Sequence, residues 1–370
     1  MSEHGQRARR TGGLQVERAA SHAEAFGRPG RRAENGPQSA ARGRCAYHIS
    51  NHGAQDHFRH AVGSVPSRYG RNGRATGLVK PRSLGYVRPE TVAEALAALA
   101  APDLEAKVLA GGQSLVPLMS MRLAAPDLVV DINRLAELSY VQVTDGQVRV
   151  GALARHAEVL GSPAAAAAQP LLRKALRFVA HPAIRNRGTT VGSIVHADPA
   201  GEMPAVLALL SGTVRVASAA GERSIPAGEF FLGPLESAVQ PGELATEVQF
   251  PALARQAAGT GFTEISRRRG DYAVCGVAAI AWLHTDGRIG GAKAAYLSMG
   301  PRPAVLDLTE AVEGAAADSR SFPAAAALAR DRFKPAPDIH ATQSYRRQLA
   351  GVLTERALTE ALAEAREAVN

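Results

Sequence analysis

Two glycine-bearing loops, about eighty residues apart, carry the residues in this chain that are best suited to chemistry. The first is Ala110-Gly111-Gly112-Gln113-Ser114-Leu115, and the second is Gly188-Thr189-Thr190-Val191-Gly192-Ser193. Glycine lets a backbone approach a ligand closely and adopt positive φ. Consecutive N–H groups in such a loop form a nest for an anion, which the positive end of a following helix reinforces. One such loop is more often a plain turn. Two in this order indicate a single extended anionic ligand, such as a pyrophosphate compound, held between two subdomains.

Two carboxylates follow the second loop. Asp198 precedes Pro199, and Glu202 lies one helical turn further on. Carboxylates beside a phosphate loop can accept hydrogen bonds from sugar or ribityl hydroxyls. Asp198 could equally cap a helix, where a negative charge is favourable at the N-terminal end. The residues alone leave both interpretations open.

Several other chemistries are disfavoured by spacing. No Gly-x-Gly-x-x-Gly follows a strand, and no Gly-Lys-Ser/Thr is present, so neither a Rossmann domain nor a P-loop is expected. Ser114 and Ser193 do not lie in a Gly-x-Ser-x-Gly nucleophile motif. His156, His181 and His196 form no i,i+4 pair and have no cysteine partner, so we expect solvated or core histidines and not metal ligands.

The basic charge of the chain is concentrated in its first 78 residues. This segment has 13 Arg, 5 acidic residues and only seven Val, Ile, Leu or Met, so it carries +8 of the total net charge of +9. It cannot bury enough apolar surface to offset the entropy of ordering, so we expect residues 1–78 to be disordered. It lacks Lys and any nucleic-acid-binding motif, so no nucleic-acid partner is expected. We interpret it as a non-native upstream extension, with translation starting at Val79.

From Lys80 onwards the pattern of apolar residues predicts an α+β protein that positions the two loops. Each loop follows an apolar element, and the Asp145-Gly146 dipeptide predicts a type I′ hairpin turn. A boundary is expected within residues 252–261, which are rich in Ala and Gly. The expected helices cover residues 92–99, 115–121, 171–179, 200–210 and 344–368. The expected strands cover residues 107–110, 128–132, 140–144, 147–151, 213–216, 222–225, 243–251, 261–266, 277–284 and 292–298.

Five ordered motifs give the chain a family resemblance that covers about residues 79–370. The run from Ala110 to Leu118 resembles the first flavin loop of the FAD-binding subunit of molybdenum hydroxylases, such as the carbon monoxide dehydrogenase medium subunit and the xanthine dehydrogenase FAD subunit. The stretch from Ile184 to Ser193, with His196 to Glu202 after it, is similar to the second flavin loop. The remaining matches are Asp131-Ile132-Asn133, Arg269-Gly270-Asp271-Tyr272-Ala273 and Tyr345-Arg346-Arg347.

The resemblance implies a fold and a cofactor. Residues 79–253 would form an FAD-binding domain of the vanillyl-alcohol-oxidase (PCMH) type, made of two α/β subdomains. Residues 254–370 would form a C-terminal α+β domain of the carbon monoxide dehydrogenase flavoprotein type. The implied ligand is FAD, and the resemblance implies neither a catalytic side chain nor a metal ligand.

The resemblance also assigns residues to the FAD site. Tyr272 would lie close to the isoalloxazine ring, and Glu202 would hold the ribityl or nearby hydroxyls. This chain departs from the family at Val191-Gly192, where the family usually has Gly-Gly, and the added Cβ can shift the loop. The phosphate-lining residues would be Ala110, Gly111, Gly112, Gln113, Ser114, Thr189, Gly192 and Ser193, and Leu115 and Asp198 complete the set of cofactor-binding candidates.

The implied function is electron transfer within a larger enzyme. A [2Fe–2S] cluster needs four protein ligands, and this chain has only Cys45 and Cys275. The resemblance therefore implies a separate [2Fe–2S] small subunit, a molybdopterin-binding large subunit, a heterohexameric assembly and a terminal acceptor that is NAD, quinone or oxygen. Two cysteines and no apolar run of transmembrane length favour the cytoplasm. The alternatives are a stand-alone FAD-dependent oxidase or dehydrogenase, and a binding module that has lost its flavin.

Overall fold

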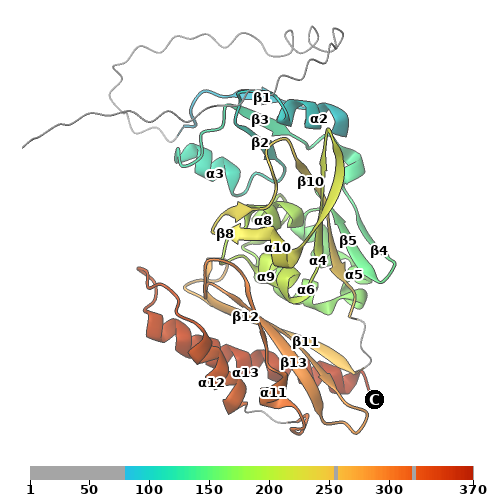
Figure 1. The fold of residues 1–370 in the computed structure, drawn as a ribbon, viewed down its shortest axis with the longest axis vertical. Coiled ribbons are helices and arrows are strands. Elements are labelled where there is room, and N and C mark those ends of the chain that lie inside the picture. The colour runs from blue at the N-terminus through green and yellow to red at the C-terminus, as the bar shows by residue number, and fades with distance from the viewer. Residues whose placement is uncertain (1–79, 254–256, 319–321, 370) are drawn as a thin grey trace, which may run out of the picture. The chain divides into compact units, whose positions relative to one another are not determined.

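The computed structural model describes residues 80–253, 257–318 and 322–369. The expectations for residues 1–78, and for a translation start at Val79, lie outside the described residues. Figure 1 shows the arrangement of the helices and strands. Within the described ranges, no helix combines the length and the apolar character needed to cross a membrane.

A three-stranded parallel sheet leads into the first glycine loop. Its strands are β1 (Gly85–Val87), β2 (Ala106–Leu109) and β3 (Leu128–Asp131), in the order β1-β3-β2. Helix α2 (Val92–Leu99) contacts β2 and β3. Thr91 is its N-cap, and Thr91 Oγ1 accepts a hydrogen bond from the Glu94 amide at 3.2 Å. The chain leaves β2 through the loop and enters α3 (Leu115–Ser120).

A five-stranded antiparallel sheet forms the second layer of the N-terminal part. Asp145 and Gly146 both have positive φ, of 52° and 70°, which confirms the predicted type I′ turn. In sheet order, the strands are β4 (Val141–Thr144), β5 (Gln147–Gly151), β10 (Leu244–Pro251), β6 (Thr213–Ser218) and β7 (Gly221–Pro226). The other elements of this part are η1 (Ala136–Leu138), α4 (His156–Gly161), α5 (Pro163–Ala168), α6 (Pro170–Leu176), α7 (Pro182–Arg185), α8 (Thr190–His196), α9 (Glu202–Leu209), α10 (Ala227–Phe230), β8 (Phe231–Gly233) and β9 (Glu236–Ser237).

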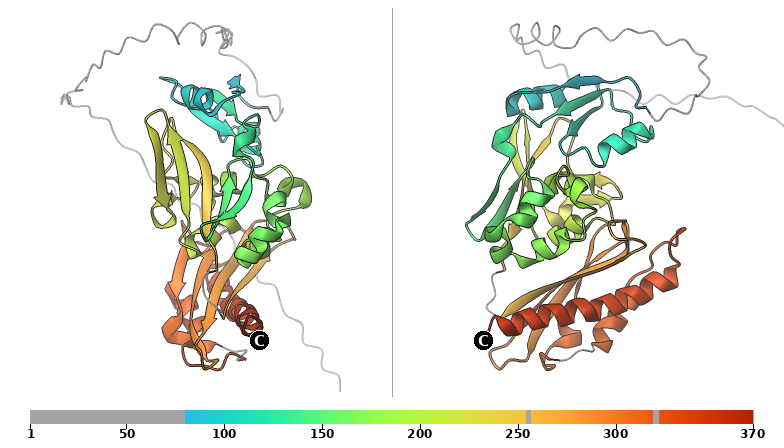
Figure 2. Two further views of the ribbon diagram at one scale, coloured as in Figure 1. Left: turned by 90° about the vertical axis from the view of Figure 1, so that its right-hand side faces the viewer. Right: turned by 180° about the vertical axis from the view of Figure 1, so that it is seen from behind.

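The C-terminal part is a four-stranded antiparallel sheet covered by helices on one face (Figure 2). Alternate residues of its strands enter two different cores. Phe262 and Leu297 join the core of the N-terminal part, whereas Val277 and Tyr296 join a second core with α13. The elements are β11 (Ala258–Ser266), β12 (Ala273–Leu283), β13 (Ile289–Leu297), β14 (Ala304–Asp307), α11 (Thr309–Val312), α12 (Pro323–Arg332) and α13 (Gln343–Glu367).

Strand β11 begins at Ala258, three residues earlier than the sequence pattern predicts. The prediction missed this start because Gly259 and Gly261 are not typical strand residues. A Cβ on Gly259 or Gly261 would collide with the backbone of α13, so both positions must be glycine for the helix to pack this closely. Glycine is depleted in strands, and the pattern was therefore misleading here. The helix also satisfies the free edge of β11: Glu360 accepts from the Phe262 amide at 3.0 Å, and Glu364 accepts from the Thr260 amide at 2.9 Å.

One segment of the N-terminal part, residues 174–181, contacts the C-terminal sheet at three places. Lys174 Nζ donates to the Thr260 carbonyl at 2.6 Å, and it also forms ion pairs with the Glu360 and Glu364 carboxylates that cap the β11 edge. The Phe178 and Phe262 rings pack with centroids 5.1 Å apart.

The third contact lies closest to the second glycine loop. A Cβ on Gly270 would lie 2.7 Å from the ring of His181, so the turn between β11 and β12 packs tightly on that side chain. His181 precedes α7, and the second loop follows α7 directly. The segment therefore connects the position of the C-terminal sheet to this loop.

Replacing Gly261 with alanine should lower the free energy of unfolding by about 1–3 kcal/mol, because the new Cβ forces α13 away from β11. Urea denaturation followed by circular dichroism measures this change. Gly228→Ala is the matched control, since a Cβ at Gly228 meets no atom within 4 Å. An unchanged stability of the Gly261→Ala variant would contradict the close packing.

Candidate functional site

The first glycine loop presents a row of unused backbone donors. Among the described residues, no group accepts a hydrogen bond from the N–H groups of residues 111–114. Gly112 has a φ of +73°, which favours glycine. The Gln113 side chain folds back and donates to the Gly111 carbonyl at 3.0 Å, and the Ser114 hydroxyl makes no cap bond to α3. Four consecutive donors without an acceptor are what an anion nest requires, so the structure is compatible with the nest that the sequence predicts.

The second loop is shaped by the cap of α8. Thr189 Oγ1 accepts from the Gly192 amide at 3.1 Å, and a Cβ on Gly192 would lie 2.5 Å from this hydroxyl, so the position requires glycine. Gly192 is exposed, and Ser193 beside it is half-buried. Val191, the residue that departs from the family pattern, is 2% exposed and packs in the core. Its side chain therefore does not cover the open backbone at Gly192.

The structure brings the two loops into direct contact. A Cβ on Gly111 would lie 2.5 Å from the Arg187 carbonyl oxygen and 2.7 Å from Gly188 Cα. A Cβ on Gly188 would in turn contact the Gln113 side chain at 3.6 Å. The first loop therefore contacts the start of the second loop at residues 187–189, which brings the two sets of candidate residues close to each other.

Polar side chains outside both loops link their carbonyl groups. Asn133 Nδ2 donates to the Ala110 carbonyl at 2.8 Å, and Arg155 Nη1 donates to the Arg187 carbonyl at 2.6 Å. Arg155 Nη2 also donates to Asn133 Oδ1 at 2.7 Å. Sequence reasoning included Asn133 only as part of a matched motif. It missed Arg155, because nothing in the local pattern around this residue indicates a partner thirty residues away.

Two of the basic and histidine side chains near the second loop have structural contacts. Arg185 Nη1 donates to the carbonyls of Val179 and Ala180 at 2.8 and 2.9 Å. His156 is buried, its Nδ1 lies 3.1 Å from Thr190 Oγ1, and burial lowers its pKa to about 4. His156 is therefore a neutral core histidine.

Asp198 and Glu202 occupy the connection between α8 and α9. Ala197 ends α8 in the left-handed region, with a φ of 54°, and Asp198 Oδ1 then accepts from the Ala200 amide at 2.9 Å. The N-cap of α9 is Gly201, so the alternative that Asp198 caps this helix is wrong. Asp198 instead shapes the turn that places Glu202 at the first position of α9.

Glu202 lies near a second carboxyl group, Glu264, that sequence reasoning missed. Glu264 lies two positions after Phe262 on β11, so the two side chains are on the same face of the sheet, the face that packs against the N-terminal part. Its Oε2 atom is buried and has no hydrogen-bond partner among the described residues. Burial, together with the negative charge of Glu202, raises the pKa of Glu264 to about 9, and burial raises the pKa of Glu202 to about 7. Glu264 therefore holds a proton at neutral pH.

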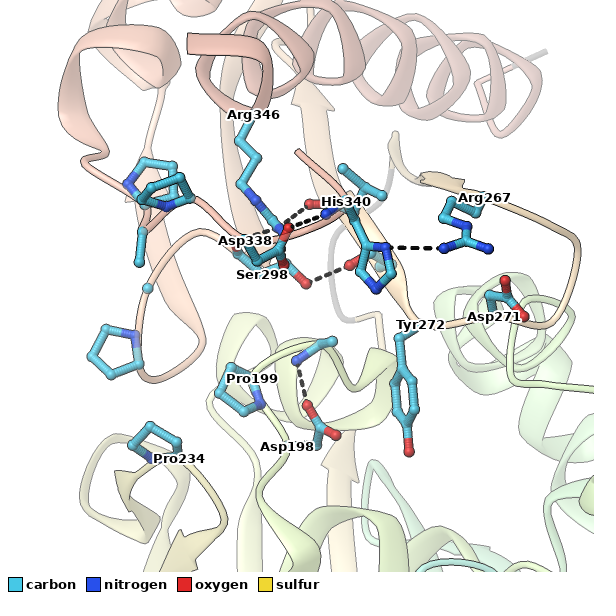
Figure 3. Close-up of a pocket in the computed structure, with 18 of the residues that line it drawn as sticks. Asp198, Pro199, Pro234, Arg267, Asp271, Tyr272, Ser298, Asp338, His340 and Arg346 are labelled. Atoms are coloured by element: carbon cyan, nitrogen blue, oxygen red, sulfur yellow. Dashed lines mark hydrogen bonds and ion pairs between the residues drawn. The ribbon is translucent and has the colours of Figure 1, made fainter. Parts of the chain in front are cut away.

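A cavity of about 850 Å³ adjoins the end of the second loop (Figure 3). Asp198 and Tyr272 both line it, and the Tyr272 side chain, which is 71% exposed, lies at its wall. The first glycine loop does not line this cavity. The structure thus places Tyr272 and Asp198 together at this cavity, which the residues of the first loop do not line.

The matched motif Tyr345-Arg346-Arg347 supports this cavity. Arg346 is 5% exposed, its Nη1 donates to the Val274 carbonyl at 2.6 Å, and its Nη2 pairs with Asp338. Arg347 Nε donates to the Arg330 carbonyl at 2.7 Å. Arg346 therefore fixes the start of β12 just after Tyr272.

Comparisons with known proteins identify two consecutive family matches. Residues 82–253 match the family described as the FAD binding domain in molybdopterin dehydrogenase. Residues 260–361 match the CO dehydrogenase flavoprotein C-terminal domain.

Relatives match over nearly their whole length. The 6-hydroxypseudooxynicotine dehydrogenase complex subunit alpha of Paenarthrobacter nicotinovorans is 40% identical over 78% of this chain and 97% of its own length. The carbon monoxide dehydrogenase medium chain of Hydrogenophaga pseudoflava is 32% identical over 77% of this chain and 99% of its own. The solved structure of quinoline 2-oxidoreductase from Pseudomonas putida 86 aligns with a TM-score of 0.73 at 34% identity, covering 79% of this chain and 100% of that one.

The buried carboxyl group of Glu264 predicts a pH-dependent stability. Because its pKa is raised from an ordinary 4.5 to about 9 in the folded chain, the native state binds more protons than the unfolded state between these values. The free energy of unfolding should therefore fall as the pH rises from about 4.5 to about 9.

Glu264→Gln, which cannot ionise, should flatten this decline, and urea denaturation at pH 5, 7 and 9 measures it. The control Glu229→Gln changes an exposed side chain and should keep the wild-type slope. An equal slope in wild type and Glu264→Gln would show that Glu264 is not the titrating group.

Proposed function

The chain belongs to the family of FAD-binding subunits of molybdenum hydroxylases, and we propose that it passes electrons from [2Fe–2S] clusters of a partner subunit through its FAD to a terminal acceptor. The predicted fold, the FAD cofactor and the oxidoreductase class are confirmed by the family matches and the relatives. The observation that carries the proposal is the contact between the two glycine loops, with four unpartnered amides beside it.

We place the FAD phosphates at the two loops. The N–H groups of residues 111–114 have no acceptor among the residues that the structure describes, and phosphate oxygens are the acceptors that a nest favours. In this proposal, Ala110, Leu115, Thr189, Gly192 and Ser193 complete the cradle. When bound, FAD supplies the redox chemistry, and the protein supplies orientation and electrostatics.

The other end of the cofactor is assigned to the cavity end of the site. Glu202 would accept hydrogen bonds from ribityl or nearby hydroxyls, and Asp198 shapes the turn that presents it. Tyr272 would lie close to the isoalloxazine ring. The domain boundaries that accompany this proposal are residues 79–253 for the FAD-binding domain and 254–370 for the C-terminal domain.

The proposed partners are a molybdopterin-binding large subunit and a [2Fe–2S] small subunit. Relatives are named as a subunit of a dehydrogenase complex and as a medium chain, which supports a multisubunit enzyme. Two cysteines cannot supply the four ligands of a cluster, so the electrons must arrive from another chain. We propose that the assembly is heterohexameric and acts in the cytoplasm, with NAD, quinone or oxygen as the acceptor.

Gly111→Val should abolish most FAD binding. The side chain would be forced against the Arg187 carbonyl and Gly188, so the two loops would separate. The ratio of flavin absorbance at 450 nm to protein absorbance, measured on the purified full chain, should fall strongly, and the dissociation constant for added FAD should rise at least about tenfold, which corresponds to 1.4 kcal/mol of lost binding. Gly161→Ala is the control, because a Cβ there meets no atom within 4 Å. Wild-type flavin occupancy in Gly111→Val would refute the placement of the first loop.

The electron-transfer role is tested by isolating the tagged chain from its native host. The proposal predicts co-purification with a molybdopterin subunit and an iron–sulfur subunit. Substrate of the complex should reduce the flavin, seen as a loss of absorbance at 450 nm, only when both partners are present. A chain that purifies alone and oxidises an alcohol or amine by itself would instead support a stand-alone FAD-dependent oxidase or dehydrogenase.

A further inference from the structure

A continuous line of polar contacts runs from the first strand through both glycine loops. Tyr86 Oη donates to Asp131, and Arg88 lies 3.7 Å from the same carboxylate, whose pKa is lowered despite its burial by the hydrogen bonds that it accepts. Asp131 Oδ1 then accepts from the Asn133 amide at 3.0 Å and from Asn133 Nδ2 at 2.6 Å. These contacts fix the orientation of the Asn133 side chain at the end of β3.

Asn133 and Arg155 then join the loops to each other. The Asn133 side chain holds the Ala110 carbonyl, and the Arg155 guanidinium holds the Arg187 carbonyl, while a 2.7 Å hydrogen bond connects the two side chains. The planar fork of arginine is suited to this, because it can donate in two fixed directions at once.

The carbonyls that are held lie at the junction of the two loops. Ala110 immediately precedes Gly111, and Arg187 immediately precedes Gly188, and these two glycines are in backbone contact. A carbonyl that is drawn toward Asn133 or Arg155 turns its peptide, so the N–H on the same peptide plane points in the opposite direction. Ala110 shares its peptide with the Gly111 amide, the first of the four unpartnered donors.

The positive charge of Arg155 is only partly balanced within the protein, by the more distant carboxylates of Glu158 and Asp131. No carboxylate lies within 4 Å of its guanidinium among the residues that the structure describes. Burial, and then the positive charge of Arg187, lower the pKa of Arg155. A partly buried cation with only neutral acceptors is costly unless an anion binds nearby.

We propose that Asn133 and Arg155 form a clamp that holds the two glycine loops together in the geometry that binds FAD, with Arg155 as the positioning residue. This inference rests on the proposed placement of FAD at both loops. The clamp acts before the cofactor arrives, since every contact in it is between residues of this chain. The resulting preorganisation should appear as affinity, because the loops need not be ordered when the ligand binds.

A double-mutant cycle on the full chain tests the clamp. Arg155→Met and Asn133→Ala should each weaken FAD binding by about tenfold, which corresponds to 1.4 kcal/mol. The double variant should lose little more than either single variant, because the two residues act through one hydrogen bond. Arg155→Lys, which keeps the charge but lacks the fork, should fall between wild type and Arg155→Met. FAD titration of the deflavinated chain, followed by flavin fluorescence, gives the dissociation constants.

Arg134→Ala is the matched control. Arg134 is the next residue after Asn133, but it is exposed and pairs with Glu90 at 2.7 Å, away from both loops. The dissociation constant of the Arg134→Ala variant for FAD should stay within about twofold of the wild-type value. This is well below the tenfold change that 1.4 kcal/mol represents.

Amide exchange in the absence of FAD provides the second readout. The His156 amide donates to the Gly188 carbonyl at 2.9 Å, and the Thr190 amide donates to the Ala154 carbonyl at 3.2 Å. Both amides should exchange faster in Arg155→Met than in wild type, whereas amides of α13 should be unchanged. If Arg155 were needed only for stability, its replacement by Met would lower the midpoint temperature of thermal unfolding and leave the FAD affinity of the folded chain unchanged.

The outcomes separate the clamp from the proposed function. If wild type binds FAD, Gly111→Val does not, and the Arg155 and Asn133 variants keep wild-type affinity, the clamp is refuted and the FAD placement stands. Additive losses in the cycle would refute the coupling between the two residues. If wild type binds no FAD, the proposed function fails. In that case, the clamp is refuted as well if the His156 and Thr190 amides exchange at the same rate in Arg155→Met as in wild type. Should Arg155→Met not fold, Arg155→Lys and Asn133→Ala decide between these results.

Discussion

The site depends on the contact between two peptide backbones where a side chain would not fit. Gly111 lies so close to Arg187 and Gly188 that even a methyl group would separate the loops. Within the described part of the chain the amides of residues 111–114 have no acceptor, and the two neighbouring carbonyls accept hydrogen bonds from Asn133 and Arg155. Backbone groups that usually bond within secondary structure are thereby left free for a ligand, and an anion bound at this place would satisfy them.

The C-terminal part controls the other end of the site. Its sheet is buried on both faces, with one face in the core shared with α9 and the other under α13, and Glu360 and Glu364 close its free edge. The turn that carries Tyr272 packs on His181 just before the second loop. The C-terminal sheet is therefore linked to the segment before the second loop by packed contacts, and the raised pKa of Glu264 lets its carboxyl group be buried on this face of the sheet as the neutral acid.

Sequence reasoning located the elements that have strong local signals and missed the contacts between distant residues. The hairpin turn at Asp145-Gly146, the Thr91 cap and the two glycine loops all follow from local chemistry, and the family motifs added FAD. The start of β11 was misplaced, because Gly259 and Gly261 serve helix packing and not strand propensity. Arg155, Glu264 and Lys174 could not be found, since each acquires its role from residues 22 to 190 positions away. Asp198 was correctly placed beside the second loop, but its role in a turn depends on the observed N-cap at Gly201.

The structure of the flavin-loaded chain at a resolution that orients the cofactor tests the central claim most directly. The account predicts pyrophosphate oxygens within hydrogen-bonding distance, about 2.7–3.2 Å, of at least two of the amides of residues 111–114, and contact of the same FAD molecule with the backbone at Gly192. A cofactor that touches only one of the two loops, or that lies wholly in the cavity beside Tyr272, would contradict it.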